Sequence, residues 1–226
     1  MKEDEPIANR IEHTLLKPEA NAAQIKKLCN EAREHNFGFI CVNAFWVKFC
    51  ATELEGSNTK VGVTVGFPLG ATSTKTKAFE TKQAIKDGAR EVDMVLNVGA
   101  LKSGKDKKVQ KDVEAVVEVA HSKQVPVKVI LENCLLTKEE IVRACLICKD
   151  AGADFVKTST GFNGPGANVD DVKLMRETVG EEMGVKAAGG IRSYEDAVAM
   201  IKAGADRLGT SSGVKIMEEY AASPDA

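Results

Sequence analysis

The feature that most constrains the fold of this chain is a short motif that recurs along it, in which a glycine follows a helix and leads into an apolar strand. The motif is clearest at residues 87–92, 151–156 and 203–208, which all contain Gly-Ala, and a looser copy covers residues 36–40. Glycine commonly ends helices because it adopts the left-handed backbone conformation at little steric cost. The chain is therefore expected to alternate helices and strands from one end to the other.

Short apolar runs rich in valine and isoleucine mark the expected strands: residues 11–16, 39–42, 61–67, 91–97, 127–132, 155–158, 184–188 and 207–210. Most are too apolar to leave one face in water, which favours parallel strands covered by helices. Over 226 residues, eight units of about 28 residues suit a barrel, whereas a doubly wound open sheet more often stops at about five or six strands. We predict an α/β fold, a (βα)8 TIM barrel, with residues 1–226 as a single domain.

The composition indicates small-molecule partners. The net charge is −2, and lysine and arginine are spread along the chain, so we expect no basic surface for nucleic acid or for an anionic membrane. Residues 1–6 are too acidic for a signal peptide, and no apolar run approaches the ~20 residues that span a bilayer. We expect a cytoplasmic protein.

The six cysteines are few and irregularly spaced, which indicates reduced thiols rather than a disulfide framework. Cys145 and Cys148 have the spacing of metal ligands, but they fall on an expected helix and no second pair follows. Packing of an apolar helix face explains them better than zinc does. The sequence therefore gives no reason to expect a metal or a cofactor.

Two lysines stand out because each lies in an apolar run that ends in small residues. Lys157 lies in residues 155–161 and Lys186 in residues 185–190. Loss of hydration disfavours an ammonium, and so does a second ammonium nearby, so both effects are expected to lower the pKa values of these lysines. A neutral lysine amine forms a Schiff base with a carbonyl compound. The alternative is a structural lysine whose head group extends toward the barrel end.

The predicted barrel brings the two lysines close together. They come from the sixth and seventh strands, which are neighbours, and functional groups of such barrels lie at the carboxyl ends of strands. Asp93 is the acid embedded in the fourth strand. Two lysines and a carboxylate supply a nucleophile, a group that tunes it and a proton carrier. The alternative for each residue is a structural ion pair.

Small polar residues follow the last three expected strands. Phosphate sites in barrels commonly use the turns after the seventh and eighth strands, where backbone N–H groups are free of bulky side chains. Glycine and serine also make tight turns, so each motif alone is a weak signal. The residues that we expect to bind substrate there are Thr160, Gly161, Gly189, Gly190, Ser211 and Ser212.

Three further residues are placed near the same mouth. Cys41, in the second strand, is expected either to contact substrate or to pack inside the barrel, and the sequence favours neither. Lys128 and Glu132 lie on one side of the fifth expected strand. We expect them to form a buried ion pair that holds Lys186 or Asp93 in place.

Taken together, these motifs closely resemble deoxyribose-phosphate aldolases, and the resemblance runs through nearly the whole chain. The resemblance implies that Lys157 forms the Schiff base, that Lys186 depresses its pKa and shares proton transfer, that Asp93 is the acid-base carboxylate, and that the glycines and serines bind phosphate. This chain has Glu12 where the family usually has Asp, and Phe162 where some members place a lysine. The motifs that carry the resemblance lie at residues 11–17, 40–43, 65–68, 91–97, 156–161, 185–192 and 209–212.

The reaction that the resemblance implies is the reversible cleavage of 2-deoxy-D-ribose 5-phosphate into D-glyceraldehyde 3-phosphate and acetaldehyde, by a class I mechanism without a metal. Homodimers are common in the family, so a homodimer is one expectation. Two other functions stay open at this point. One is an imine-forming aldolase or transaldolase that acts on a longer sugar phosphate, and the other is a barrel that only binds a phosphorylated ligand.

Overall fold

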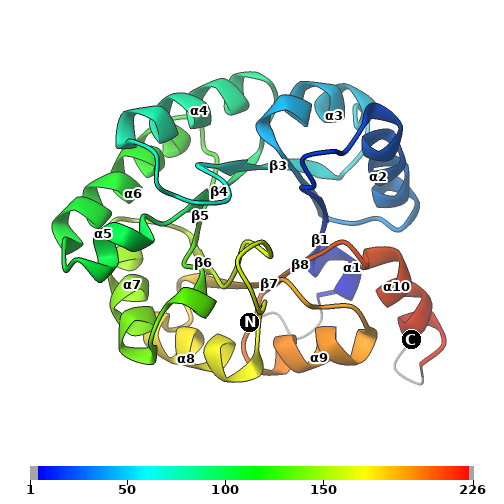
Figure 1. Ribbon diagram of the computed structural model, residues 1–226. Coiled ribbons are helices and arrows are strands. Elements are labelled where there is room, and N and C mark those ends of the chain that lie inside the picture. Colours follow the sequence, from blue (N-terminus) through cyan, green and yellow to red (C-terminus); the bar gives the residue numbers. More distant parts are fainter. Residues whose placement is uncertain (1–4, 224–226) are drawn as a thin grey trace.

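The computed structural model describes residues 5–223 and shows a closed barrel of parallel strands inside a ring of helices (Figure 1). Each strand pairs with its neighbour in sequence, and β1 closes the barrel against β8. The predicted (βα)8 TIM barrel is therefore confirmed. The strands are β1 (Ile11–Leu15), β2 (Phe39–Val42), β3 (Lys60–Val65), β4 (Glu91–Val95), β5 (Val127–Ile130), β6 (Phe155–Lys157), β7 (Gly184–Ala188) and β8 (Arg207–Thr210).

Helices follow the strands and cover the outside of the barrel (Figure 1). Within residues 5–223, none of them is long and apolar enough to cross a membrane. The terminal residues 1–4, which hold most of the acidic segment considered for a signal peptide, lie outside the described part, as do residues 224–226. The helices are α1 (Ile7–Arg10), α2 (Ala22–Glu34), η1 (Ala44–Trp46), α3 (Val47–Glu53), α4 (Thr74–Lys86), α5 (Val98–Lys102), α6 (Asp106–His121), η2 (Asn133–Leu135), α7 (Lys138–Asp150), α8 (Val169–Val179), α9 (Tyr194–Lys202) and α10 (Gly213–Ala221).

The recurring glycines lie where the sequence predicts, at the turn between a helix and the next strand. Gly88, Gly152 and Gly204 all have positive φ angles, of 116°, 78° and 110°. At Gly204 a Cβ atom would also come within 2.7 Å of the Arg176 side chain, so a larger residue is excluded by space as well as by conformation. In the looser copy of the motif, the left-handed residue is Asn36, with φ 54°, instead of a glycine.

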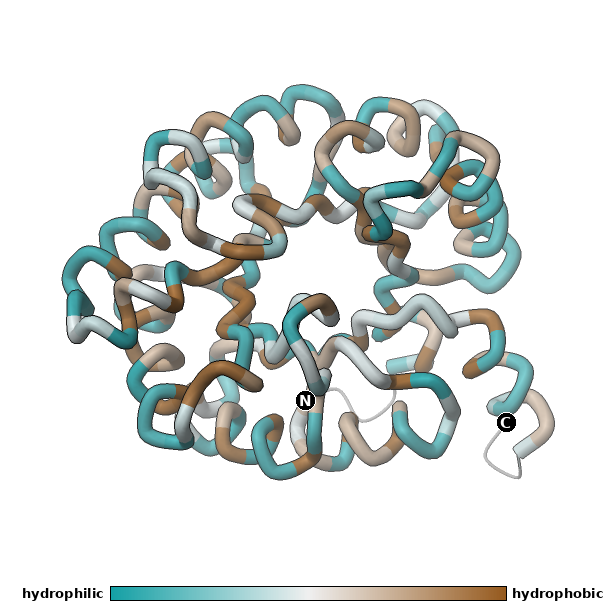
Figure 2. The backbone as a smooth tube through the Cα atoms, in the orientation of Figure 1, coloured by the Kyte–Doolittle hydropathy of each residue, from teal (hydrophilic) through white to brown (hydrophobic). Residues whose placement is uncertain are grey.

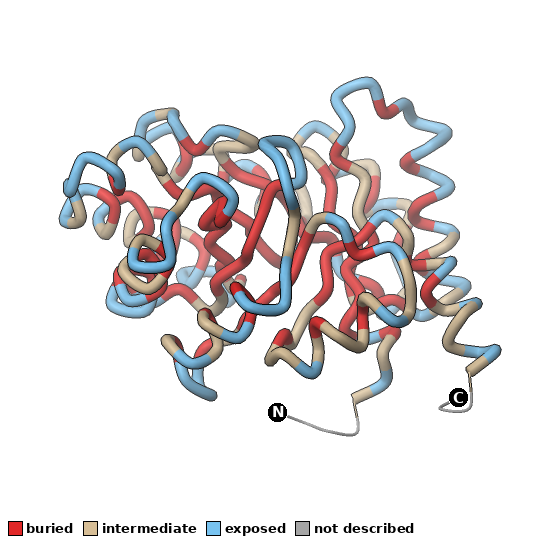
Figure 3. The backbone as a smooth tube through the Cα atoms, turned by 60° about the horizontal axis from the view of Figure 1, so that its bottom comes forward, coloured by how far each residue is buried: buried red, intermediate tan, exposed pale blue. Residues whose placement is uncertain are grey.

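The two faces of the strands differ sharply in chemistry. In β4, Val92 and Met94 belong to the apolar core between sheet and helices, whereas the alternate residues Glu91 and Asp93 make ion pairs inside the barrel. Stretches of the strands are hydrophobic in Figure 2, and the strands are mostly buried in Figure 3. The barrel interior, usually filled by branched apolar side chains, is therefore charged in this protein.

Several predicted strands extend too far at their carboxyl ends. β5 ends at Ile130 rather than at Glu132, because Glu132 adopts a left-handed conformation with φ 61°. β3 ends before Gly66, which has φ 63°, and β4 ends before Asn97, whose side chain caps α5. In each case, the last residues of the expected strand instead begin the loop at the barrel mouth.

Candidate active site

Lys157 of β6, Lys186 of β7 and Asp93 of β4 meet inside the barrel. The register of β6 and β7 places Lys157 directly beside Lys186. One oxygen, Asp93 Oδ2, accepts a hydrogen bond from the Nζ atom of each lysine, at 2.7 Å in both cases. All three residues are buried, with exposed fractions of 3% or less. The structure thus brings these three residues into one cluster.

The electrostatics of this cluster correct one expectation. Burial alone would lower the pKa of Lys186, but the carboxylates of Asp93 and Glu12 outweigh it and raise that pKa above its ordinary value. The lowered pKa predicted for Lys186 is therefore wrong, because the sequence argument counted dehydration and the neighbouring ammonium but not two carboxylates in contact. Lys186 carries its proton at neutral pH.

The pKa of the Asp93 carboxylate is shifted in the opposite direction, downward. Burial would raise the pKa of Asp93, but the ammonium groups of Lys157, Lys186 and Lys128 outweigh burial and hold it well below its usual range. Asp93 is therefore ionised at neutral pH and connects the cations around it. A carboxylate in this position can accept a proton only briefly and pass it on, because its protonated form is disfavoured.

A cavity of about 560 Å³ opens above the cluster at the carboxyl ends of the strands. Its volume suits a small organic ligand. Of the lysines inside the barrel, Lys157 lines this cavity, whereas Lys186 and Lys128 do not. Lys157 is therefore the interior amine that a ligand in the cavity can reach.

The glycine turns after the last strands form one wall of the cavity. Gly161, Gly189 and Gly190 line it, with φ angles of 83°, 83° and 81°, and Ser211 lines it from the turn after β8. A Cβ atom at Gly161 or Gly190 would meet no atom within 4 Å. Glycine adopts the left-handed backbone at these positions at little cost. Because glycine has no side chain, the backbone N–H groups of this wall are accessible to an anion.

A sequence profile of the DeoC/LacD family aldolases matches residues 6–219. The chain belongs to the DeoC/LacD aldolase family. It is 64% identical over 208 residues to a deoxyribose-phosphate aldolase of Clostridium novyi, covering 92% of this chain and 93% of that one. It is 61% identical to the Streptococcus sanguinis enzyme of the same name, with 95% and 97% covered.

A solved structure gives the same family likeness in three dimensions. The deoxyribose phosphate aldolase of Aeropyrum pernix, described as a unique tetrameric structure, superposes with a TM-score of 0.89 at 35% identity. The match covers 95% of this chain and 91% of that one. This DeoC/LacD family member therefore shares the fold of a deoxyribose phosphate aldolase over nearly its whole length.

Two of the predicted substrate-binding residues have other partners. Thr160 lines the cavity, but its backbone N–H donates to Glu132 at 2.9 Å and its hydroxyl bonds to the same carboxylate. Ser212 precedes α10 and is not among the lining residues, and its N–H donates to Thr210 Oγ1 at 2.9 Å. Thr160 thus anchors the loop after β6, and Ser212 belongs to the turn before α10.

The predicted pair of Lys128 with Glu132 is wrong. Glu132 leaves the strand in its left-handed conformation and accepts hydrogen bonds from Thr160 and from Asn163 Nδ2, the latter at 2.7 Å. Lys128 instead bonds to Glu91 and lies 3.4 Å from oxygens of both Glu12 and Asp93. Alternation along β4, with Glu91 two residues before Asp93, is the signal that identifies the true partner.

Cys41 lies inside the barrel and away from the cavity wall. Its side chain is fully buried, and its Sγ atom lies 4.0 Å from Asp93 Oδ2. Burial and the Asp93 carboxylate raise the pKa of the thiol to about 11, so it stays protonated at neutral pH. Its contacts fit packing against the cluster.

Sequence reasoning missed the cations at the rim of the cavity. Lys17, from the loop after β1, and Arg192, from the loop after β7, both line the cavity and are exposed. Each lies in a motif that resembles the family, but neither is in an apolar run, and so neither stood out. Lys17 and Arg192 carry positive charge at the rim of this cavity, whereas Phe162, which also lines it, carries none.

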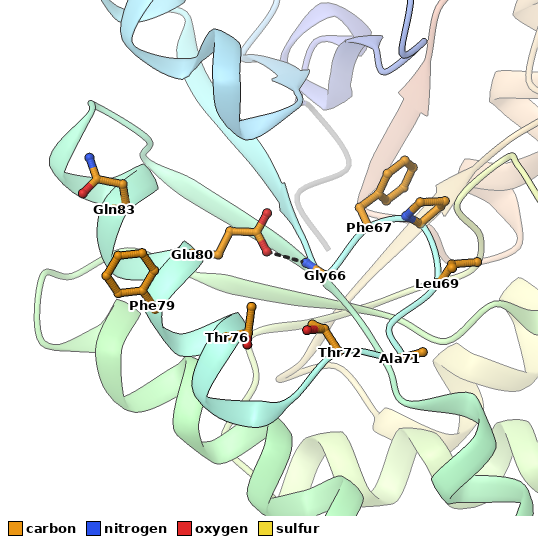
Figure 4. Close-up of a pocket in the computed structure, with 10 residues that line it drawn as sticks. Gly66, Phe67, Leu69, Ala71, Thr72, Thr76, Phe79, Glu80 and Gln83 are labelled. Atoms are coloured by element: carbon orange, nitrogen blue, oxygen red, sulfur yellow. Dashed lines mark hydrogen bonds between the residues drawn. The ribbon is translucent and has the colours of Figure 1, made fainter.

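A larger cavity, of about 730 Å³, lies on the outer side of the β3–α4 loop (Figure 4). Apolar side chains, including Phe67, Leu69 and Phe79, line it, and its one carboxylate, Glu80, accepts a hydrogen bond from Gly66 N at 2.8 Å. No lysine lines this cavity. It offers no amine for a Schiff base, so the smaller, more polar cavity above Lys157 is the candidate active site.

Proposed function

We propose that this chain catalyses the reversible cleavage of 2-deoxy-D-ribose 5-phosphate into D-glyceraldehyde 3-phosphate and acetaldehyde through a Schiff base on Lys157. One observation carries the proposal. Among the buried lysines of the barrel, Lys157 is the one that both contacts Asp93 and lines the mouth cavity. The names of relatives that are 61–64% identical supply the substrate.

The chemistry begins with a neutral Lys157 amine. It attacks the C1 aldehyde of the open-chain sugar, and the carbinolamine loses water to give a protonated imine. The C3 hydroxyl then loses its proton while the C2–C3 bond breaks, which releases glyceraldehyde 3-phosphate and leaves an enamine. Protonation of the enamine at C2 and hydrolysis of the resulting imine release acetaldehyde and restore the lysine.

Asp93 and Lys186 move and balance charge during these steps. Asp93 lies between the two ammonium groups and, directly or through water, accepts the hydroxyl proton and returns it to the enamine. Lys186 remains a cation, since its carboxylate partners raise its pKa. Its charge offsets the pull of Asp93 on the Lys157 ammonium and so favours the reactive neutral amine.

We place the phosphate group at the glycine wall, against Gly161, Gly189, Gly190 and Ser211, with Thr160 holding the loop beside it and Ser212 in the turn before α10. Backbone N–H groups of these glycines and the Ser211 hydroxyl would bind the anion there, and the cations Lys17 and Arg192 lie at the rim. Binding so far from the reacting carbon fixes the orientation of the substrate, so it contributes to turnover as well as to affinity.

The test uses the purified protein with 2-deoxy-D-ribose 5-phosphate. We expect acetaldehyde and glyceraldehyde 3-phosphate in equal amounts, and a lower kcat with unphosphorylated 2-deoxyribose. Borohydride with acetaldehyde should leave a covalent adduct on the protein. An adduct that forms only with a ketose phosphate identifies a different imine-forming aldolase or transaldolase. No adduct with any carbonyl compound identifies a barrel that binds phosphorylated ligands without catalysis.

We also propose a cytoplasmic location and a homodimer. All six cysteines are free thiols, and five of them are buried, which suits a reducing compartment. Light scattering during size-exclusion chromatography decides the oligomeric state, with a mass of twice 24.2 kDa expected and four times that mass found if the chain assembles like the Aeropyrum pernix tetramer.

A further inference from the structure

A second set of charges lies deeper in the barrel than the reacting cluster. The register pairs Lys128 of β5 with Asp93 of β4, one layer below the level at which Lys157 pairs with Lys186. Lys128 Nζ bonds to Glu91 and lies 3.4 Å from Glu12 Oε1 and 3.4 Å from Asp93 Oδ1. Glu12 in turn bonds to Lys186. All interior charges therefore belong to one connected network.

The two oxygens that face Lys128 have no hydrogen-bond partner among the described residues. These atoms, Glu12 Oε1 and Asp93 Oδ1, are buried. Lys128 is thus the cation nearest to these two oxygens, while Lys186 bonds to the second oxygen of each carboxylate, Glu12 Oε2 and Asp93 Oδ2. Its position between them gives Lys128 a direct electrostatic influence on Asp93, and through Asp93 on Lys157.

The surroundings of Lys128 exclude water. Its side chain is fully buried, and its Nζ atom lies 5.7 Å from the ring centre of Phe39 on β2 and 5.5 Å from that of Phe155 on β6. The other charged group that acts on it is Lys186 on β7. Charge effects are strong in such an environment, because neither solvent nor mobile ions screen them.

Among the described residues, this network contains three lysines (Lys128, Lys157, Lys186) and three carboxylates (Glu12, Glu91, Asp93). It is neutral when all six groups are ionised, and conversion of Lys157 to a neutral amine leaves one excess negative charge. Removal of another cation would make this conversion harder, and removal of a carboxylate would make it easier.

We propose that Lys128 and Glu91, which do not contact the cavity, set the pH at which Lys157 becomes a nucleophile, through their charges on the Asp93 carboxylate. The proposal rests on the proposed function, since it assumes that Lys157 reacts. Lys128 and Glu91 are positioning residues in this account. They act on the reaction through Asp93 and do not touch the substrate.

The test measures the rate at which acetaldehyde and cyanoborohydride modify Lys157 as a function of pH, by mass spectrometry of the Lys157 peptide. We expect Lys128→Met to shift the curve to higher pH by about one unit, because the ammonium form of Lys157 gains stability. Glu91→Gln should shift it to lower pH by a similar amount. The double variant Lys128→Met/Glu91→Gln loses one charge of each sign, and its curve should return to that of the wild type.

The matched control is Lys60→Met. Lys60 Nζ lies 5.8 Å from the ring centre of the same Phe39, but this lysine is exposed at the start of β3. Its curve should coincide with the wild-type curve. If Lys128→Met does not fold, the comparison of Glu91→Gln with the double variant and the wild type decides the question.

Two failures are distinguishable. A wild-type protein that is not modified at Lys157 overturns the proposed function and this inference together. A wild-type protein that is modified, with single-variant curves that do not move or that move in the same direction, overturns the inference alone. Circular dichroism and thermal unfolding of each folded variant separate a shift in pH from a loss of structure.

Discussion

This protein buries lysine–carboxylate pairs in two regions, and the pairs differ in what surrounds them. Inside the barrel, Lys186 contacts two carboxylates, Asp93 and Glu12. Outside it, between α4 and α6, the Lys77 Nζ atom lies 2.5 Å from Asp112 Oδ2 and 2.8 Å from the carbonyl oxygen of Val95. Both lysine side chains have no exposed surface.

The pKa values of the two lysines move in opposite directions. Burial lowers the pKa of Lys77, and the contacting Asp112 carboxylate, together with the Glu80 charge, offsets this only in part. Burial also disfavours the ammonium form of Lys186, but two contacting carboxylates outweigh burial and raise the pKa of Lys186. Burial alone therefore does not identify a reactive amine. The number of carboxylates in contact with the lysine and its access to the mouth cavity must be known as well, and among Lys77, Lys157 and Lys186 only Lys157 lines that cavity.

The comparison also assigns a structural role to Lys77. It ties the end of β4, at Val95, to α4 and α6, and Thr74 Oγ1 completes the cluster with a 2.8 Å hydrogen bond to Asp112 Oδ1. This cluster lines neither cavity. Substitutions in the barrel should thus change chemistry first, and substitutions between the helices should change stability first.

The largest effect is expected for Lys157→Ala. Loss of the nucleophile should reduce kcat for cleavage by about four orders of magnitude or more, because no other buried lysine of the barrel lines the cavity and Lys17 lies exposed at its rim. The measurement is steady-state cleavage of 2-deoxy-D-ribose 5-phosphate, with circular dichroism to show that the barrel is intact. Retention of more than a hundredth of the wild-type activity would mean that another amine does the chemistry.

Lys186→Leu should have the next largest effect. Asp93 then acts on the Lys157 ammonium without a competing cation at its Oδ2 atom, so the neutral amine becomes rarer at pH 7. We expect about a tenfold loss of kcat/KM at pH 7, corresponding to a shift of the acid limb of the pH profile to higher pH by about one unit. An unchanged profile in a folded variant contradicts the tuning role of Lys186.

Lys77→Met tests the prediction that the pair between α4 and α6 supports stability and not catalysis. Asp112 is left buried without its cation, and the free energy of unfolding should fall by about 3–5 kcal/mol while kcat changes less than about threefold. Urea unfolding and cleavage assays give the two quantities. The matched variant Lys77→Met/Asp112→Leu removes both charges and should regain most of the lost stability. A large fall in kcat for the double variant would show that this pair supports catalysis.

The smallest effect concerns acid stability. The folded pKa of Asp93 lies well below its ordinary 3.8, since nearby ammonium groups outweigh burial, so its share of the stability is complete above pH 3.8 and is lost as the pH falls below that value. Asp93→Asn should flatten the plot of unfolding free energy against pH below 3.8, by up to about 1.4 kcal/mol per pH unit. Asp150→Asn, at the exposed end of α7, should leave the slope unchanged.

The barrel could be predicted from the sequence because its signals are local. Glycines such as Gly88 and Gly152 act within a few residues, and the structure confirms them. Cys145 and Cys148 likewise pack in the core on α7, as the helical spacing predicts.

What the sequence did not reveal depends on contacts between distant segments. The partners of Lys128 come from β1 and β4, and Glu132 was assigned to the wrong partner because a single left-handed residue turned it out of the strand. The direction of the Lys186 pKa depends on Glu12, which is 174 positions away. Lys77 has no local feature that marks it as buried.

The most direct test of the account is to find which lysine carries the adduct after borohydride reduction with acetaldehyde. Tandem mass spectrometry of the wild-type protein reports on Lys128, Lys157, Lys186 and Lys77 in one experiment. We predict an adduct on Lys157 alone among these four, since it is the one that lines the cavity. An adduct on Lys186, or equal modification of Lys157 and Lys186, would contradict the assignment of Lys157 as nucleophile and Lys186 as permanent cation.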